Sequence, residues 1–354
     1  MCERGRIRED DQLGELMRTD KVSLRGKLMR DMMKNMMDSA MGHRIQTGEL
    51  RKNPVEPAWI CPAEYEYEIV EMEKFSMEYL RPAQVCTGRV ILQLHGGGYI
   101  GPMKNIYRDF AVYYSKRSMG GDVLTIDYRV APEYPYPAAL MDAVEAYRWL
   151  LEEKQYAPEK IVVAGDSAGG GLTLALAMYL RDHHIPMPAG LVLMSPWTDL
   201  TCSGESHETN FNRDPQFGGT TDNLLHNSVY IGEADPSDPY LSPAFGHFEK
   251  MPPVLIQVGS EEVLLSDTLT VANKLRAAKG RLRVSVYDGM FHEFQMALRL
   301  IPESREAWEE IGTFLEIIYG IRRKPDGKVV KRVKSGRRQQ RKTDEDYCGG
   351  SGEN

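Results

Sequence analysis

The sequence has few cysteines, and they are not arranged as a metal-binding or disulfide framework. They number five and are scattered, at Cys2, Cys61, Cys86, Cys202 and Cys348. No C-x-x-C pair occurs, which argues against a zinc ribbon, and an odd, dispersed set argues against a disulfide-stabilised fold. We therefore expect a protein of a reducing compartment, the cytoplasm, with no metal site.

Long hydrophobic runs are also missing. A membrane-spanning helix requires about eighteen consecutive apolar residues, and no such stretch occurs. Residues 1–10, MCERGRIRED, carry charges in place of the apolar core of a signal peptide. The composition therefore predicts no stable membrane insertion and a cytoplasmic location.

Charge is unevenly distributed within a net charge of −7 at pH 7. Residues 322–342 are dense in lysine and arginine with few apolar residues, and residues 344–354 are acidic and rich in glycine. Such a segment cannot bury enough apolar surface to fold, so we expect residues 321–354 to form a disordered basic tail. Binding of nucleic acid or anionic lipid is the alternative for this tail, but a solvated tail is the commoner outcome and we expect no nucleic-acid partner.

Glycine is concentrated after two predicted strands. The run at 161–164 is apolar and β-branched, residues 172–180 predict a helix, and Gly-Asp-Ser-Ala-Gly at 165–169 lies between them. A strand, a sharp glycine-flanked turn and a helix together form a nucleophile elbow, in which a serine hydroxyl projects above the sheet. Ser167 is therefore the candidate nucleophile, although G-x-S-x-G alone also occurs by chance in glycine-containing loops.

The second glycine cluster is HGGGY at 95–99, directly after the strand pattern at 90–94. Consecutive glycines leave backbone N–H groups free to point at one negatively charged atom. No Lys-Ser or Lys-Thr pair follows and no G-x-G-x-x-G is formed, which argues against a phosphate loop. With the amide that follows the serine, the cluster predicts an oxyanion hole made of Gly97, Gly98 and Ala168.

Six sets of motifs occur in one order along the chain. They are HGGGY at 95–99, DYRVAPEYPYPAA at 127–139, GDSAGG at 165–170, SPWTD at 195–199, DPYLSP at 238–243, and GSEEVLLSD at 259–267 followed by YDGMFHEF at 287–294. Over about residues 60–320 the sequence resembles the hormone-sensitive-lipase-like branch of the α/β-hydrolases, the bacterial family IV esterases. The resemblance implies an α/β-hydrolase fold, with a mostly parallel central sheet flanked by helices and an N-terminal helical cap.

A nucleophilic serine needs an imidazole within hydrogen-bond reach and a carboxylate that orients this imidazole. In α/β-hydrolases the acid and then the histidine follow the serine. The histidines after the serine are His183, His184, His207, His226, His247 and His292. His292 follows an alternating strand pattern and a glycine turn, which places it at the carboxyl edge of the sheet, whereas the others lie at a helix end or in polar loops. We therefore predict His292 as the base, as the resemblance also implies.

The acid is open to more than one assignment. The buried strand pattern at 254–259 ends just before Glu261 and Glu262, and Asp267 follows. In the resembling esterases the acid lies about thirty residues before the histidine and is commonly an aspartate followed by Pro-Leu. Glu262 aligns with that position, so we predict Glu262, with Glu261 and Asp267 as alternatives. A glutamate is chemically suited to this role.

The first sixty residues carry apolar side chains at helical spacing and predict two amphipathic helices, at about 13–17 and 24–37. The resemblance implies a cap over the catalytic mouth. Its methionines could line an apolar substrate channel or pack the cap onto the core; they are Met32, Met33, Met36 and Met37. We expect a cap segment at 1–60, a catalytic domain at 61–320 with a cap insertion at about 200–235, and the tail at 321–354.

These features predict a carboxylic ester hydrolase with a Ser-His-Glu triad and a covalent acyl-enzyme, which requires no metal and no organic cofactor. The alternatives are a lactone or amide hydrolase with the same triad, and a non-catalytic ligand-binding member of the fold. The resemblance implies a small-molecule ester with a small to medium acyl group as substrate, and often a homodimer formed through an edge strand. Tyr99, Trp197 and Phe211 are candidates for the pocket wall, and equally for the core.

Overall fold

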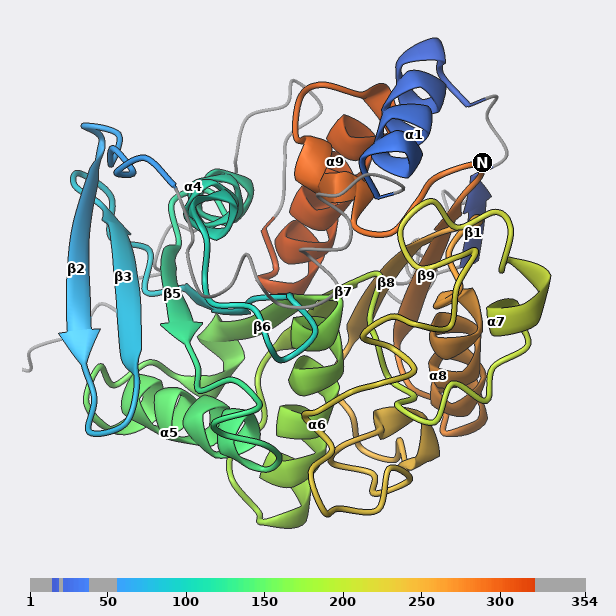
Figure 1. Ribbon diagram of the computed structural model, residues 1–354. Coiled ribbons are helices and arrows are strands. Elements are labelled where there is room, and N and C mark those ends of the chain that lie inside the picture. The colour runs from blue at the N-terminus through green and yellow to red at the C-terminus, as the bar shows by residue number, and fades with distance from the viewer. Residues whose placement is uncertain (1–14, 19–21, 38–55, 322–354) are drawn as a thin grey trace, which may run out of the picture. The chain divides into compact units, whose positions relative to one another are not determined.

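A twisted sheet forms the centre of the protein. The structure is a computed structural model, and it describes residues 15–18, 22–37 and 56–321. Within these residues the sheet has nine strands in the order β1-β9-β8-β7-β6-β4-β5-β3-β2 (Figure 1). The strands are β1 (Glu15–Arg18), β2 (Tyr65–Glu71), β3 (Ser76–Pro82), β4 (Val90–Leu94), β5 (Asp122–Asp127), β6 (Ile161–Asp166), β7 (Gly190–Met194), β8 (Val254–Gly259) and β9 (Leu282–Tyr287). Across the sheet, each adjacent pair of strands in the series β1-β9-β8-β7-β6-β4-β5 is parallel. In contrast, β3 pairs antiparallel with both β5 and β2.

The central strands are buried along their whole length. Every residue of β4, β6, β7 and β8 is buried, which explains why apolar residues predominate on both faces of these strands. Both faces of a parallel sheet must be covered by helices for this pattern to be stable. The predicted α/β-hydrolase architecture, with a mostly parallel sheet flanked by helices, is thus confirmed.

Helices cover both faces of the sheet. The helices are α1 (Leu24–Met37), α4 (Asn105–Arg117), α5 (Ala138–Glu152), α6 (Ala168–Asp182), α7 (Ser206–Thr209), α8 (Leu265–Ala277) and α9 (Pro302–Ile318), with short 3-10 turns at Pro158–Lys160, Pro243–Phe245 and Phe294–Ala297. In Figure 1, α4 and α9 lie on one face of the sheet and α5, α6 and α8 on the other. Each face has its own apolar core: Phe110 and Trp308 belong to the first, and Leu176 and Leu275 to the second.

The N-terminal segment differs from its prediction. Residues 15–18 form β1, which pairs in parallel with Val284–Tyr287 of β9, so the helix predicted at about 13–17 is wrong for these residues. An edge strand presents unpaired backbone N–H and C=O groups, and pairing with them satisfies a four-residue segment that is too short to nucleate a stable helix. Leu13 of that predicted helix lies outside the described residues.

The second predicted N-terminal helix is present as α1. Ser23 begins it: its hydroxyl accepts from the Gly26 amide at 2.9 Å, and its own amide donates to Glu303 at 2.7 Å. Met29 and Met33 pack against the apolar cluster around Phe291. The opposite face is exposed, with Leu24, Leu28 and Met32 at 84%, 70% and 58% of their full accessibility, and Met36 is exposed as well. Of the four methionines proposed for a channel, Met33 therefore packs inward, Met32 and Met36 face solvent, and the side chain of Met37 lies outside the described part of the chain.

Several predictions about the ends of the chain fall outside the described residues. The tail predicted at 321–354 is described only at Ile321, and Cys2 and Cys348 are not described. Cys61, Cys86 and Cys202 are free thiols. Within residues 15–18, 22–37 and 56–321, no helix combines the length and the hydrophobicity that crossing a membrane requires.

Candidate active site

Ser167 lies in a strained turn between β6 and α6. Its backbone has φ 50° and ψ −119°, a conformation that residues other than glycine seldom adopt. The turn requires flanking glycines because a Cβ on Gly165 would lie 2.2 Å from the Gly169 carbonyl oxygen, and one on Gly169 would lie 2.0 Å from that of Leu94. The amide of Ser167 donates to the Met194 carbonyl at 2.9 Å, which fixes the turn against β7.

The three predicted triad residues form one continuous line of hydrogen bonds. His292 Nε2 lies 2.9 Å from Ser167 Oγ, and His292 Nδ1 lies 2.9 Å from Glu262 Oε2. All three side chains are buried. A carboxylate can only accept a hydrogen bond, so Nδ1 carries the proton and Nε2 presents a lone pair to the serine hydroxyl. This is the tautomer that a general base acting on the serine needs.

The second oxygen of Glu262 is held as firmly as the first. Its Oε1 accepts from Ser195 Oγ at 2.7 Å and from the Gly259 amide at 2.5 Å. Ser195 Oγ also accepts from the Glu293 amide at 3.2 Å, so one hydroxyl links the acid loop to the histidine loop. The sequence contains Ser195 within the motif SPWTD but gives it no role. Its position directly after β7, beside the strand of the nucleophile, is the signal that could have found it.

The alternative acids are engaged elsewhere. Glu261 forms a bidentate ion pair with Arg213 at 2.7 and 2.9 Å. Asp267 accepts from the amides of Thr198 and Asp199 at 2.7 and 2.8 Å, and burial raises the pKa of its carboxyl to about 8. Of the three candidates, the structure therefore brings only Glu262 to the imidazole.

The glycine loop after β4 presents free amides beside the serine. Gly97 and Gly98 have φ values of 107° and 63°, which a glycine adopts without strain. Within the described part of the chain, the N–H groups of Gly97, Gly98 and Ala168 have no hydrogen-bond acceptor. His95 anchors the start of the loop: its ring stacks on Tyr128 at 4.1 Å, and its carbonyl accepts from the Tyr128 hydroxyl at 2.7 Å. Free N–H groups on a loop that is held in place can donate hydrogen bonds to an oxyanion that forms beside the serine.

Two further carboxyls lie buried beside the triad. Burial and the neighbouring Asp166 raise the pKa of Glu293 well above its usual range, and burial also raises the pKa of Asp166. The Tyr107 hydroxyl donates to Asp166 Oδ2 at 3.2 Å. Asp166 thus lies buried beside the elbow. Arg129, in the motif at 127–139, forms an ion pair with Asp142 at 2.6 Å.

The segment between β7 and β8 supplies side chains that the sequence did not identify. The Phe217 ring meets the His292 ring edge-on at 5.0 Å, and a Cβ on Gly98 would lie 2.7 Å from Leu224 Cδ1. Asn210 Nδ2 donates to the Glu262 carbonyl at 2.8 Å, and Asp214 accepts from the Val263 amide at 2.8 Å. This segment, predicted as a cap insertion at about 200–235, therefore contacts the histidine, the loop that carries the acid and the glycine loop.

Of the three aromatic residues proposed for the pocket wall or the core, two lie in the core. Tyr99 and Trp197 are buried in the apolar core, where Tyr99 stacks on Tyr230 at 3.9 Å and Trp197 Nε1 donates to the Asp199 carbonyl at 3.1 Å. Phe211 is half-buried, and its carbonyl accepts from the Gly219 amide. Phe217 is the aromatic residue of this segment that reaches the imidazole.

Comparison with known proteins identifies the family. A profile of the family described as alpha/beta hydrolase fold matches residues 91–296. An acetyl-hydrolase of Streptomyces hygroscopicus is 39% identical over 253 residues, covering 72% of this chain and 83% of that protein. An esterase of Acinetobacter venetianus is 34% identical over 232 residues, covering 66% of this chain and 76% of that protein.

Solved structures agree with this match. The protein EstE5, soaked with p-nitrophenyl butyrate, has a TM-score of 0.76 at 33% identity, covering 84% of this chain and 99% of that one. An esterase from the bacterial hormone-sensitive lipase family has a TM-score of 0.74 at 31% identity, covering 84% of this chain and 99% of that one. The chain therefore belongs to the α/β-hydrolase family, and within it to the hormone-sensitive-lipase-like esterases.

Proposed function

We propose that this chain hydrolyses carboxylic esters of small to medium acyl groups through a triad of Ser167, His292 and Glu262 and a covalent acyl-enzyme. The observation that carries the proposal is the line of hydrogen bonds from hydroxyl to imidazole to carboxylate, with 2.9 Å at each step. The names of the relatives support the ester as substrate and a short acyl chain, since they include an acetyl-hydrolase and a protein soaked with p-nitrophenyl butyrate.

Acylation begins when Ser167 Oγ attacks the ester carbonyl carbon. The hydroxyl proton passes to His292 Nε2, and Glu262 stabilises the imidazolium that forms while keeping the ring in place. The carbonyl oxygen becomes an oxyanion, which the amides of Gly97, Gly98 and Ala168 receive. The carbon–oxygen bond to the alcohol then breaks, His292 returns its proton to the departing alkoxide, and the acyl group remains on the serine.

Deacylation repeats these steps with water as the nucleophile. His292 Nε2 takes a proton from water as the oxygen attacks the acyl carbon, and a second oxyanion forms in the same position. Collapse of this intermediate breaks the bond to Ser167 Oγ, which receives the proton from His292, and releases the carboxylic acid. No electron transfer occurs, and both half-reactions use the same three side chains.

The amides contribute because they are fixed before charge develops. Each backbone donor directed at a developing oxyanion contributes about 10²- to 10³-fold to the rate in enzymes of this type. Glycine permits the positive φ values at Gly97 and Gly98, and the stacking of His95 on Tyr128 holds the start of the loop in this arrangement. Reorganisation of the donors during the reaction is therefore small.

Substitution of the nucleophile and of two adjacent glutamates tests the proposal. Ser167→Ala should lower kcat/KM for p-nitrophenyl acetate by roughly a thousandfold or more. Glu262→Ala should lower it by about a hundredfold or more, whereas Glu261→Ala, the neighbouring control that removes only the ion pair with Arg213, should change it by less than about threefold.

Near-wild-type turnover by Ser167→Ala would refute the nucleophile, and a larger loss in Glu261→Ala than in Glu262→Ala would refute the assigned acid.

A panel of acyl chain lengths, lactones and anilides, measured with the wild-type chain, tests the substrate class. We expect the highest kcat/KM for short acyl esters. A lactone or anilide turned over faster than every ester would favour the alternative hydrolases.

A further inference from the structure

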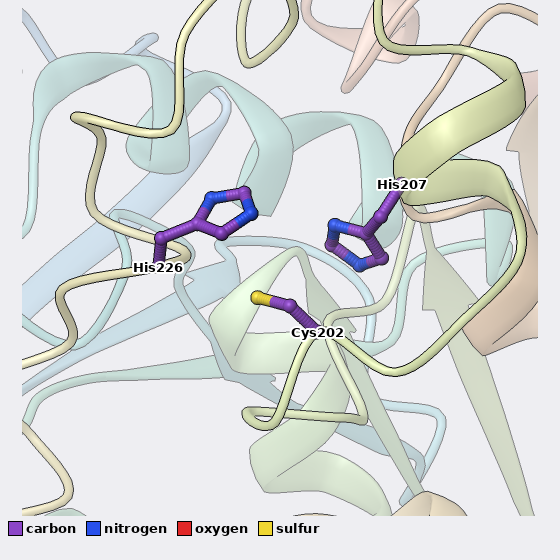
Figure 2. A group of neighbouring side chains, drawn as sticks. All are labelled: Cys202, His207 and His226. Carbon is purple, nitrogen blue, oxygen red and sulfur yellow. The ribbon is translucent and has the colours of Figure 1, made fainter.

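Three side chains of the segment between β7 and β8 converge at a point outside the triad. Figure 2 shows Cys202, His207 and His226 directed toward one another. One potential ligand atom of each residue lies within 4.8 Å of the other two. The cluster combines one sulfur with two imidazoles, which is a donor set that zinc prefers.

His207 is buried without the hydrogen bonds that a buried imidazole normally makes. The residue is only 8% exposed, and neither ring nitrogen has a hydrogen-bond partner among the described residues. Its Nε2 faces Asp267 Oδ1 at 3.9 Å, and this oxygen also lacks a hydrogen-bond partner within the described part of the chain. Buried polar groups in this state call for an explanation such as an ion.

The tautomer of His226 follows from its neighbour Asn223. The side-chain amide of Asn223 donates to the carbonyls of Phe217 and Thr220, and its Oδ1 accepts from the Leu225 amide at 3.0 Å. That oxygen is therefore an acceptor, and His226 Nδ1, 3.1 Å away, must be the donor. His226 Nε2 consequently carries the lone pair, held in place by a hydrogen bond on the far side of the ring. Metal-binding histidines are oriented in this way.

Cys202 completes the group from the start of the segment. Its thiol donates to the Leu225 carbonyl at 3.3 Å, so the sulfur already lies beside the loop that carries His226. Burial raises the pKa of this thiol to about 12, so in the metal-free protein the sulfur is protonated. A metal that binds sulfur displaces such a proton to solvent.

We propose that Cys202, His207 and His226 bind a zinc ion. The ligand atoms are Cys202 Sγ, His226 Nε2 and His207 Nδ1, which leaves His207 Nε2–H directed at the Asp267 carboxylate as an outer-shell partner. Zinc–ligand bonds of about 2.0–2.3 Å in a tetrahedron place one sulfur and two nitrogens roughly 3.3–3.5 Å apart, so closure from separations within 4.8 Å needs the ligand atoms to approach one another by at most about 1.5 Å. A solvent molecule on the exposed side of His226 supplies the fourth ligand.

The zinc ion would act as a clamp on the segment that covers the triad. It joins residue 202, just after β7, to residue 226, and the chain between them carries Phe217 against His292 and Leu224 against Gly98. Fixing the two ends of this stretch limits how far Phe217 can move from His292 and Leu224 from Gly98. The ion has no part in the proposed hydrolysis. A metal site at these residues differs from the sequence prediction of no metal, because the three ligands form no recognisable spacing in the sequence.

Metal binding to the full chain tests the clamp directly. The background carries Cys2→Ser and Cys348→Ser, which removes two thiols outside the described residues. After chelation and dialysis we expect one equivalent of Zn²⁺ to bind in competition with a chromophoric chelator. Co²⁺ should give a thiolate-to-cobalt charge-transfer band in the near ultraviolet. Cys202→Ser should abolish this band, and His226→Gln, at an exposed position, should weaken Zn²⁺ binding at least tenfold.

Matched controls use residues of the same types elsewhere on the surface. Cys86→Ser and His247→Gln should leave the Zn²⁺ affinity and the cobalt band unchanged, since both residues are exposed. Zn²⁺ should raise the thermal midpoint of the wild-type chain but not that of His226→Gln, because a ligand stabilises only the state that binds it. A cobalt band that persists in Cys202→Ser, or equal Zn²⁺ affinity in the wild-type chain and His226→Gln, would overturn the proposal.

Discussion

At the scale of single residues, the position of Glu262 depends on a hydroxyl that the sequence motif contains but does not explain. Ser195 Oγ donates to Glu262 Oε1 and accepts from the Glu293 amide. We predict that Ser195→Ala lowers kcat by about tenfold with little change in KM, because a hydrogen bond to a charged group contributes about 1.5–3 kcal/mol and the Gly259 amide remains. Steady-state kinetics with p-nitrophenyl acetate measure this effect. Recovery of activity in Ser195→Thr would support positioning, and unchanged kcat in Ser195→Ala would refute it.

The buried Asp166–Glu293 pair makes stability depend on pH. The pKa of Glu293 is raised in the folded chain, so the folded state keeps a proton that the unfolded state releases above about pH 4.3. The retained proton adds to the free energy of unfolding. This contribution is complete at low pH and is lost as the pH rises from the unfolded pKa toward the pKa of Glu293 in the folded chain. We predict that Glu293→Gln, which has no proton to lose, flattens the fall in the urea midpoint between pH 6 and pH 8. Parallel curves for the two proteins would contradict the prediction.

At the scale of elements, the oxyanion loop depends on the absence of a side chain at Gly98. Its φ of 63° disfavours any residue other than glycine, and a Cβ there would lie 2.7 Å from Leu224 Cδ1, so the leucine side chain or the loop would have to shift. We predict that Gly98→Ala lowers kcat/KM by about 10- to 10³-fold, through displacement of the amide donors. Gly88→Ala is the control, since Gly88 has a φ of 65° but nothing within 4 Å of its Cβ position. Equal activity of the two variants would show that backbone strain and crowding at Gly98 do not matter.

Helices and strands with a strong local residue pattern could be predicted from the sequence. Those that are stabilised by pairing or packing with distant segments of the chain could not. The strands at 90–94 and 254–259 agree with β4 and β8 because apolar residues predominate on both faces of buried parallel strands. β1 was missed because its backbone is stabilised by pairing with β9, which no local pattern records. The inward face of α1 was also predicted only in part: of the methionines proposed to line a channel or to pack, Met33 packs, whereas Met32 and Met36 are exposed.

The same distinction holds within the site. Ser167 and His292 follow strands at recognisable turns, and the structure brings them to 2.9 Å. The choice between the two adjacent glutamates depends on how the turn after β8 orients each side chain. In the structure Glu262 reaches the imidazole and Glu261 reaches Arg213. Phe217 and Leu224 come from an irregular segment without periodicity, so the sequence could not indicate that they contact His292 and the position of Gly98.

At the scale of the whole molecule, the sheet order assembles the site. β4 lies beside β6, which places the glycine loop next to the elbow, and β7, β8 and β9 follow in sequence to deliver Ser195, Glu262 and His292. Because these strands are parallel, the loops after them lie at the same carboxyl edge, where open α/β sheets bind ligands. The segment between β7 and β8 then covers that edge with side chains that reach both the histidine and the glycine loop.

The most direct measurement of the central claim is the mass of the intact chain after reaction with a fluorophosphonate, with the modified residue located by peptide sequencing. Such reagents phosphonylate a serine that an adjacent base activates, and the oxyanion donors stabilise the adduct. We predict one adduct per chain, on Ser167, formed in parallel with the loss of esterase activity and absent in Ser167→Ala. An adduct on any other residue, or undiminished modification of Ser167→Ala, would contradict the account.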